Sequence, residues 1–295
     1  MQEGYLVVGG DSLVGGGVIR ALKKRGHTCV ATTRRKESVS DDRVYLDFRD
    51  EAVFEAPSNI NYAFIIAATT NYERCETDPE AHVTNVEHIP RLVLSLLDQG
   101  VFVTFISTNS VFGGDQAWPN EDAPHDPRIA YAQQKSLGEK NILDGAKAAG
   151  TLELLNIVRL TKILTPDVSP LPGWIETWGK GEVVEPFSDL LFAPMSVEFV
   201  SESLVTIGEH RISGMLHLSG ADNVSYTQLA ESMARRLSFS SDLIKPTTAT
   251  AKGIEIAFKP RYSGLGMERT TRLTGLHPQM LDDLVDGIFP APKEN

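Results

Sequence analysis

The chain has 295 residues, of which 41% are hydrophobic and 23% are charged. These are ordinary values for a globular protein and exclude an intrinsically disordered chain, and the length allows one domain or two. The formal net charge of −11 at pH 7 argues against nucleic acid or an anionic membrane as a partner, because either would need a basic face.

The two cysteines, Cys29 and Cys75, are too few for a disulfide framework, and no Cys or His spacing is typical of a metal site. The first residues contain neither a basic segment nor a long apolar one, and no apolar segment reaches transmembrane length. We therefore expect a reducing compartment and a cytoplasmic location.

Short apolar runs alternate with amphipathic segments over roughly the first 165 residues. This pattern predicts an α/β fold, a doubly wound parallel sheet of the Rossmann type with helices on both faces. Strands are predicted at 5–8, 28–32, 44–46, 63–67, 101–106 and 154–160. Helices are predicted at 13–25, 79–99 and 131–149, each ending near a glycine that can cap it.

After residue 164 the chain becomes rich in proline and glycine, which indicates irregular segments and a smaller lobe. Regular structure is predicted to return as a helix at 197–208, a strand at 214–218 and a helix at 226–236. We therefore expect a dinucleotide-binding domain over 1–165, rejoined by 195–219, and a smaller C-terminal substrate-binding lobe formed by 166–194 and 220–295.

A glycine-rich turn joins the first predicted strand to the first helix. Gly9 allows a tight turn, and Gly15 allows the helix to approach the strand while its N-terminal amides face a pyrophosphate. Ser12 takes the middle position, where a glycine is usual. The placement of the turn favours dinucleotide binding over a plain strand-to-helix connection. The residues of the turn expected to contact the cofactor are Gly9, Asp11, Ser12, Leu13, Val14 and Gly15.

The residues that end the second strand, Thr33, Arg34 and Arg35, include no acid. An acid there would bind a ribose 2′-hydroxyl and a base would bind a 2′-phosphate, so NADP(H) is favoured, with NAD(H) as the alternative. A solvated basic loop is the other interpretation, and Asp11 would oppose a phosphate nearby. At the end of the third strand Asp47, followed by Phe48, is a candidate for the adenine amine or for a strand-end turn.

Tyr131 and Lys135 lie four residues apart in a predicted helix, which places a phenol and an ammonium on one face. A phenol has an ordinary pKa near 10, and a fixed cation beside it would lower that pKa toward the working range. The pair predicts acid/base chemistry on an alcohol or a carbonyl, although the spacing alone is common.

With these features the chain resembles the extended short-chain dehydrogenase/reductase family, and within it the dTDP-4-dehydrorhamnose reductase-like branch of sugar-nucleotide enzymes. The resemblance covers nearly the whole chain. The matching segments are Phe105-Ile-Ser-Thr-Asn-Ser-Val-Phe-Gly113, Glu121-Asp-Ala-Pro-His-Asp-Pro127 and Tyr131-x-x-x-Lys135-x-x-Gly138-Glu139.

The resemblance implies roles for individual residues. Tyr131 would protonate the substrate oxygen, Lys135 would hold the nicotinamide ribose and bias the Tyr131 pKa, and Thr108 would hydrogen-bond the same oxygen. Further cofactor contacts are implied at Ala67, Ala68, Thr69, Asn85 and Leu160. Substrate contacts are expected at Thr69, Thr108, Asn109, Trp174 and Arg261, with a core position as the alternative for Trp174. Arg261 and Lys259 are candidates for a substrate pyrophosphate, with surface charges as the alternative.

Asn109 and Ser110 stand where related dehydratases have an Asp-Glu pair and related reductases have Asp-Tyr. Dehydration is therefore disfavoured, and the sugar, the nucleotide and the stereochemistry stay open. The expected function is NADP(H)-dependent reduction of a nucleotide-linked keto sugar at C4, with Tyr131 as the proton donor. A sugar-nucleotide epimerase and a non-catalytic NADP-binding regulatory subunit are the alternatives. Homodimers are common in this family, but the sequence carries no interface signal.

Overall fold

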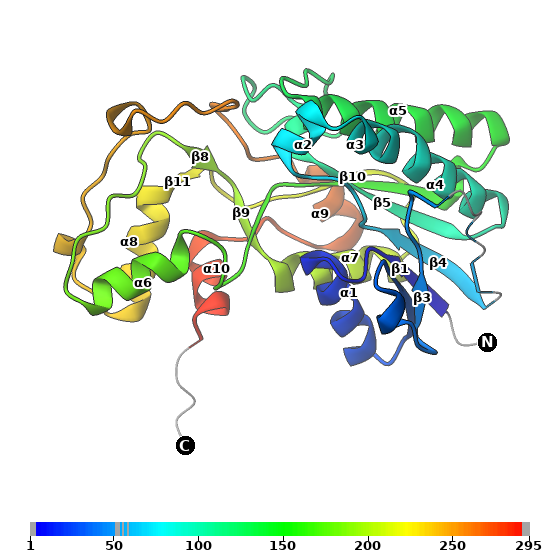
Figure 1. Ribbon diagram of the computed structural model, residues 1–295, viewed down its shortest axis with the longest axis horizontal. Coiled ribbons are helices and arrows are strands. Elements are labelled where there is room, and N and C mark those ends of the chain that lie inside the picture. Colours follow the sequence, from blue (N-terminus) through cyan, green and yellow to red (C-terminus); the bar gives the residue numbers. More distant parts are fainter. Residues whose placement is uncertain (1–3, 51–53, 55, 58, 291–295) are drawn as a thin grey trace.

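The computed structural model describes residues 4–290, apart from 51–53, 55 and 58. Within this part, seven strands form one sheet in the order β10-β6-β5-β4-β1-β2-β3, and each neighbouring pair is parallel (Figure 1). The strands are β1 (Gly4–Val8), β2 (Thr28–Thr33), β3 (Arg43–Tyr45), β4 (Ile60–Ile65), β5 (Phe102–Thr108), β6 (Leu155–Leu160) and β10 (Gly214–Leu218). The predicted doubly wound α/β fold is confirmed.

The order of the strands reverses between β1 and β4, because the chain first builds β2 and β3 on one side of β1 and then returns to its other side. In open α/β sheets a ligand binds beyond the carboxyl ends of the strands at such a reversal. The topology therefore places the glycine-rich turn, which follows β1, at the expected position of a binding cleft.

Helices cover both faces of the sheet (Figure 1). Tyr5 and Val7 of β1 belong to the apolar core under α1 (Leu13–Lys24) and α7 (Val197–Glu209), whereas Leu6 and Val8 belong to the core under α4 (Ile89–Asp98) and α5 (Ala130–Ala149). Alternate residues of a strand point to opposite faces, so a strand covered on both sides is apolar throughout.

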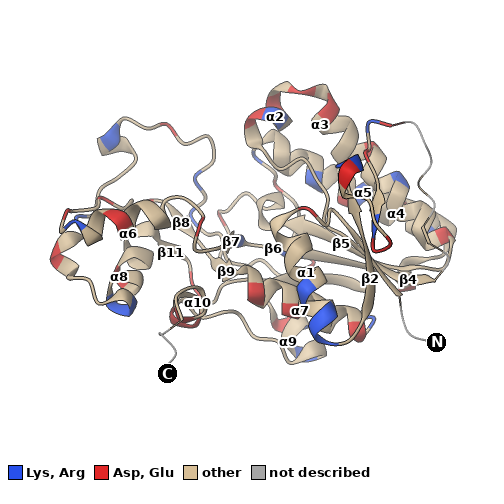
Figure 2. Cartoon of the chain, turned by 60° about the horizontal axis from the view of Figure 1, so that its bottom comes forward, with Lys and Arg blue, Asp and Glu red and all other residues tan. Residues whose placement is uncertain are grey.

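The layer formed by α1 and α7 also contains ion pairs. Arg25, which caps α1, binds Glu202 of α7 at 2.7 Å and Glu209 at 2.5 Å, and Figure 2 shows basic positions at the end of α1 close to acidic ones on α7.

The predicted glycine ends of helices are confirmed, since Gly26, Gly100 and Gly150 all have positive φ.

The helix predicted over 79–99 is interrupted. It consists of α3 (Pro79–Val83), a π-helical turn at Thr84–His88 and α4, and the amide of Ile89 donates to the carbonyl of Thr84. Pro90 has no N–H to give to the carbonyl of Val86, and the side chain of Asn141 on α5 donates to that carbonyl instead, at 2.9 Å. Proline and a partner from another helix therefore explain the irregular turn.

The smaller lobe has its own apolar core, which includes Trp178, Leu229 and Leu284. It contains α6 (Leu171–Gly179), β8 (Leu191–Phe192), β11 (Val224–Ser225), α8 (Tyr226–Leu237) and α10 (Leu281–Ile288). The strands β7 (Lys162–Leu164) and β9 (Pro194–Ser196) pair in parallel where the chain leaves and re-enters the sheet layer, and α9 (Glu268–Thr274) packs against β10.

The remaining short elements are α2 (Tyr72–Thr77) and the 3₁₀ turns at Lys36–Ser38, Asn109–Val111, Leu152–Leu154, Ser241–Leu243 and Thr250–Lys252. The observed elements differ from the predicted ones mainly at their ends, as in β4, which begins at Ile60. Over the residues that the structure describes, no helix combines the length and the apolar character needed to span a membrane.

Candidate functional site

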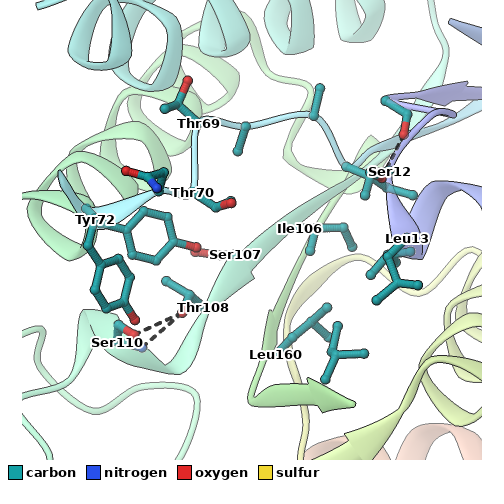
Figure 3. Close-up of a pocket in the computed structure, with 18 of the residues that line it drawn as sticks. Ser12, Leu13, Thr69, Thr70, Tyr72, Ile106, Ser107, Thr108, Ser110 and Leu160 are labelled. Carbon is teal, nitrogen blue, oxygen red and sulfur yellow. Dashed lines mark hydrogen bonds between the residues drawn. The ribbon is translucent and has the colours of Figure 1, made fainter. Parts of the chain in front are cut away.

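A cleft of about 1260 Å³ opens at the carboxyl end of the sheet and continues to the smaller lobe. Figure 3 shows Ser12 and Leu13 on one side of it, Tyr72, Thr108 and Ser110 on the other, and Ile106 and Leu160 between them. The predicted site residues that line the cleft are Gly9, Asp11, Ser12, Leu13, Val14, Thr33, Arg34, Asp47, Phe48, Ala67, Ala68, Thr69, Thr108, Asn109, Tyr131 and Leu160. Those that do not line it are Gly15, Asn85, Lys135, Trp174 and Arg261.

The glycine turn leaves no room for side chains at its two ends. Gly9 has a φ of +92°, and a Cβ there would lie 2.7 Å from the amide nitrogen of Ala67. A Cβ at Gly15 would lie 2.2 Å from the carbonyl oxygen of Gly9. Ser12 caps α1, because its Oγ accepts from the amide of Gly15 at 3.0 Å and donates to the carbonyl of Gly9 at 2.7 Å. The tight turn and the free amides of a helix N-terminus fit a dinucleotide pyrophosphate.

Basic side chains surround the end of the cleft near β2 and β3, where Arg34, Arg35 and Arg49 line it. Arg49 binds the carboxylate of Asp47, with Nη2 2.5 Å from Oδ2. Hydrogen bonds from Arg49 lower the pKa of Asp47 to about 2, although partial burial opposes the shift. The carboxylate of Asp47 is thus already paired, and its contact with adenine stays a prediction. Sequence reasoning missed Arg49, whose only signal is its position two residues after Asp47.

Tyr131 and Thr108 meet at the opposite end of the cleft. Both residues line the cleft, and Thr108 Oγ1 accepts from the amide of Ser110 at 3.2 Å. Burial raises the pKa of Tyr131 above its ordinary value, and the nearby Thr108 side chain opposes this shift. The hydroxyl is therefore protonated at neutral pH.

Lys135 does not reach the cleft surface. It is only 3% exposed, its Nζ donates to the carbonyl of Ile106 at 2.8 Å, and it lies 4.0 Å from the centre of the Phe105 ring. Burial lowers its pKa to about 8. The sequence predicts that Lys135 lowers the Tyr131 pKa, but that pKa is raised, because burial of the phenol dominates and the ammonium is directed to β5.

Asn85 lies behind the wall of the cleft, in the π-helical turn. Its side chain accepts from the amide of Thr69 and donates to the carbonyl of the same residue, each at 2.9 Å. It also donates to Gln134 at 2.9 Å, and Gln134 donates to the carbonyl of Cys75 at 2.8 Å. Asn85 thus positions Thr69, which lines the cleft. Sequence reasoning missed Gln134, whose signal would have been an uncharged polar side chain on the buried face of the Tyr131 helix.

The smaller lobe does not contribute Trp174 and Arg261 to the cleft, although the sequence predicts substrate contacts at both. Trp174 is 8% exposed and packs against Trp178 with ring centroids 6.2 Å apart, so it occupies the core. Arg261 lies over the ring of Tyr262 and does not line the cleft. The lobe residues that do line it include Phe192, Tyr226, Phe258 and Lys259.

Two further contacts shape the substrate side. Asn109 Nδ2 donates to the carbonyl of Ser263 at 2.8 Å, which joins the end of β5 to the smaller lobe. Lys259 pairs with Asp189 at 2.5 Å. Tyr72, which sequence reasoning also missed, lines the cleft beside Tyr131; no spacing in the sequence connects these two residues.

Comparisons with known proteins found a matching family model, similar curated proteins and solved structures that share the fold. A protein-family model described as the RmlD substrate binding domain matches residues 3–288. A protein of Streptomyces antibioticus named probable dTDP-4,6-dihydroxy-2-methyloxan-3-one 4-ketoreductase is 27% identical over 280 residues, which cover 93% of this chain and 90% of that protein.

Solved structures share the fold. The dTDP-4-dehydrorhamnose reductase of Bacillus anthracis, in complex with NADP, superposes with a TM-score of 0.80 at 18% identity, covering 98% of each chain. A protein named MoeE5, in complex with UDP-glucuronic acid and NAD, superposes with a TM-score of 0.74 at 20% identity, covering 95% of this chain and 96% of that one.

Proposed function

The chain belongs to the RmlD substrate binding domain family, and on this premise we propose that it reduces a nucleotide-linked keto sugar at C4 with NADPH, using Tyr131 as the proton donor. As the names of its relatives indicate, the chain is an NAD(P)-dependent oxidoreductase of the sugar-nucleotide class, with NADP favoured and NAD as the alternative cofactor. The name of the Streptomyces relative supports a dTDP-linked substrate.

The observation that carries the proposal is that Tyr131 and Thr108 line one cleft together with the glycine turn. NADPH, when bound, supplies a hydride to the carbonyl carbon of the sugar. Tyr131 donates its proton to the carbonyl oxygen, and Thr108 holds that oxygen in place by a hydrogen bond. A raised pKa keeps Tyr131 protonated, as a donor for reduction must be.

The two parts of the chain have separate tasks in this proposal. Residues 1–165 and 195–219 bind the dinucleotide, with Arg34 beside the 2′-phosphate. Residues 166–194 and 220–295, apart from α9, bind the sugar nucleotide. Of the two cations that the sequence offers for a pyrophosphate, Lys259 and Arg261, we assign this role to Lys259, because it lines the cleft. Tyr226 and Phe192, whose rings lie 4.5 Å apart, offer apolar surface to the base or the sugar.

Thermal-shift measurements with NADPH, NADH and a panel of dTDP-, UDP-, GDP- and CDP-sugars identify the ligands, because a ligand that binds the native state stabilises it. Consumption of NADPH is then measured with the corresponding 4-keto sugar nucleotide. Stoichiometric oxidation of NADPH supports the reductase. Turnover on tightly held cofactor without net oxidation would show an epimerase, and cofactor binding without turnover on any sugar nucleotide would show a regulatory subunit.

A further inference from the structure

The carboxylate of Asp11 is hydrogen-bonded to the end of β2, which is the part of the fold where the adenosine ribose of a dinucleotide is recognised. Thr33, the last residue of β2, donates its hydroxyl to Asp11 Oδ2 at 2.7 Å, and the same hydroxyl accepts from the amide of Arg35 at 3.1 Å. Asp11 and Thr33 both line the cleft. An acid therefore stands at the ribose position, although it comes from the glycine turn rather than from the strand end.

A carboxylate at this position has opposite effects on the two dinucleotides. It accepts a hydrogen bond from a ribose 2′-hydroxyl, and it repels a 2′-phosphate. Left alone, Asp11 would thus favour NAD(H) and oppose the neighbouring Arg34 and Arg35, which favour NADP(H).

Arg43, the first residue of β3, binds the other carboxylate oxygen of Asp11, with Nη1 2.6 Å from Oδ1. Parallel pairing of β2 with β3 places Arg43 opposite Ala31 and holds it near the glycine turn. Burial raises the pKa of Asp11, but the hydrogen bonds from Thr33 and Arg43 outweigh it, so this pKa falls below its ordinary value. Asp11 is therefore ionised, and both of its oxygens are engaged.

We propose that Arg43 determines cofactor specificity through Asp11: it cancels the charge of the carboxylate and so allows a 2′-phosphate to bind beside Arg34 and Arg35. Without Arg43, Asp11 selects the dinucleotide that lacks the phosphate. Arg43 does not line the cleft and is a positioning residue. The inference rests on the proposed function only in assuming that the cleft binds a nicotinamide dinucleotide.

Equilibrium dissociation constants for NADPH and NADH, measured by fluorescence on the full chain, test the proposal. We expect Arg43→Ala to raise the ratio of the NADPH dissociation constant to the NADH dissociation constant about tenfold. The reason is that the uncompensated charge of Asp11 repels the 2′-phosphate, which only NADPH carries. Arg43→Lys should keep the wild-type ratio. Asp11→Asn should lower the ratio, and in this background Arg43→Ala should leave it unchanged within about a factor of two.

Lys23→Ala is the matched control, because Lys23 pairs with Asp42, the neighbour of Arg43, at 2.9 Å. It removes a nearby cation without freeing Asp11, so it should not move the ratio. The ratio of the two dissociation constants is also insensitive to partial misfolding, because misfolding weakens the binding of both cofactors alike.

The inference would be overturned if Arg43→Ala left the ratio of the two dissociation constants unchanged. It would also be overturned if Arg43→Ala changed this ratio equally in the wild-type protein and in the Asp11→Asn variant. These outcomes leave the proposed function intact, since they presuppose that the wild-type protein binds a dinucleotide. If the wild-type protein binds neither NADPH nor NADH, the proposed function fails and the inference fails with it.

Discussion

The ring of Tyr72 lies against the ring of Tyr131, with centroids 5.4 Å apart and planes inclined by 28°. Tyr72 belongs to α2 and is 51% exposed, whereas Tyr131 lies in the first turn of α5. Burial is the main cause of the raised Tyr131 pKa, and the nearby phenol of Tyr72 adds to it. Tyr72 thus shields the proposed proton donor.

Tyr72→Ala should lower the pKa of Tyr131, because removing a covering ring hydrates the phenol and favours the phenolate. A proton donor is active while protonated, so activity is lost as the pH rises through its pKa. The alkaline limb of the kcat/KM profile should therefore move to lower pH in Tyr72→Ala. Tyr72→Phe, which keeps the ring, should move it less. An unchanged limb in Tyr72→Ala would show that Tyr72 does not control the donor.

Tyr131→Phe should reduce kcat by about 10²- to 10⁴-fold, the usual contribution of a positioned acid. The dissociation constant for NADPH should change little, since the substitution removes one hydroxyl and keeps the ring packed on Tyr72. Steady-state kinetics and NADPH titration measure the two effects separately. Full activity in this variant would contradict the assignment of Tyr131 as the donor.

Lys135→Met should change the pH dependence of stability. Burial lowers the Lys135 pKa to about 8 from an ordinary 10.5, so the unfolded chain binds more protons between these values and the stability of the wild type rises with pH across this window. Relative to Lys135→Met, the wild type should gain about 3 kcal/mol of unfolding free energy between pH 8 and 10.5.

Urea unfolding at a series of pH values measures this difference. A constant difference between the two proteins over that window would show that Lys135 is not desolvated in the native state. Lys180→Met is a suitable control, because Lys180 is an exposed lysine paired with Glu176 on the surface of α6.

Gly15→Ala should weaken NADPH binding about tenfold or more and destabilise the fold by about 1–3 kcal/mol, because its Cβ would lie 2.2 Å from the carbonyl oxygen of Gly9. Gly16→Ala is the matched control, since the nearest atom to its Cβ is the flexible Arg20 Nη1 at 3.5 Å. Alanine there should stabilise α1 by about 0.5–1 kcal/mol. Equal effects of the two substitutions on the NADPH dissociation constant would contradict a role of close backbone packing in cofactor binding.

Gln134→Ala should destabilise the protein by about 1–3 kcal/mol, because it leaves the carbonyl of Cys75 and one donor of Asn85 unpaired in a buried place. It should also raise the KM for NADPH, since Asn85 positions Thr69. Gln133→Ala, on the exposed side of the same helix, should have neither effect. Urea unfolding and steady-state kinetics compare the two variants, and identical results would exclude the proposed positioning role.

Local patterns in the sequence were sufficient for the elements of the sheet layer. Short apolar runs and the glycines after helices predicted β1, β2 and α1 nearly to the residue, because caps and periodicity act over a few residues. The helix at 79–99 shows the limit of such patterns. Its π-helical turn depends on Asn141, which approaches Val86 from a different helix.

By itself the sequence determined the fold class and the glycine turn, and it indicated Thr108, Tyr131 and Lys135 as candidate site residues, since these signals are contained in short segments. Only the tertiary structure decided how the side chains pair. It directs Lys135 to Ile106 rather than to the phenol, places Trp174 in a core and Lys259 in the cleft, and brings Arg43 to Asp11. The reason is that burial and pairing depend on segments far apart in the chain, whose contacts leave no periodic signal in the sequence.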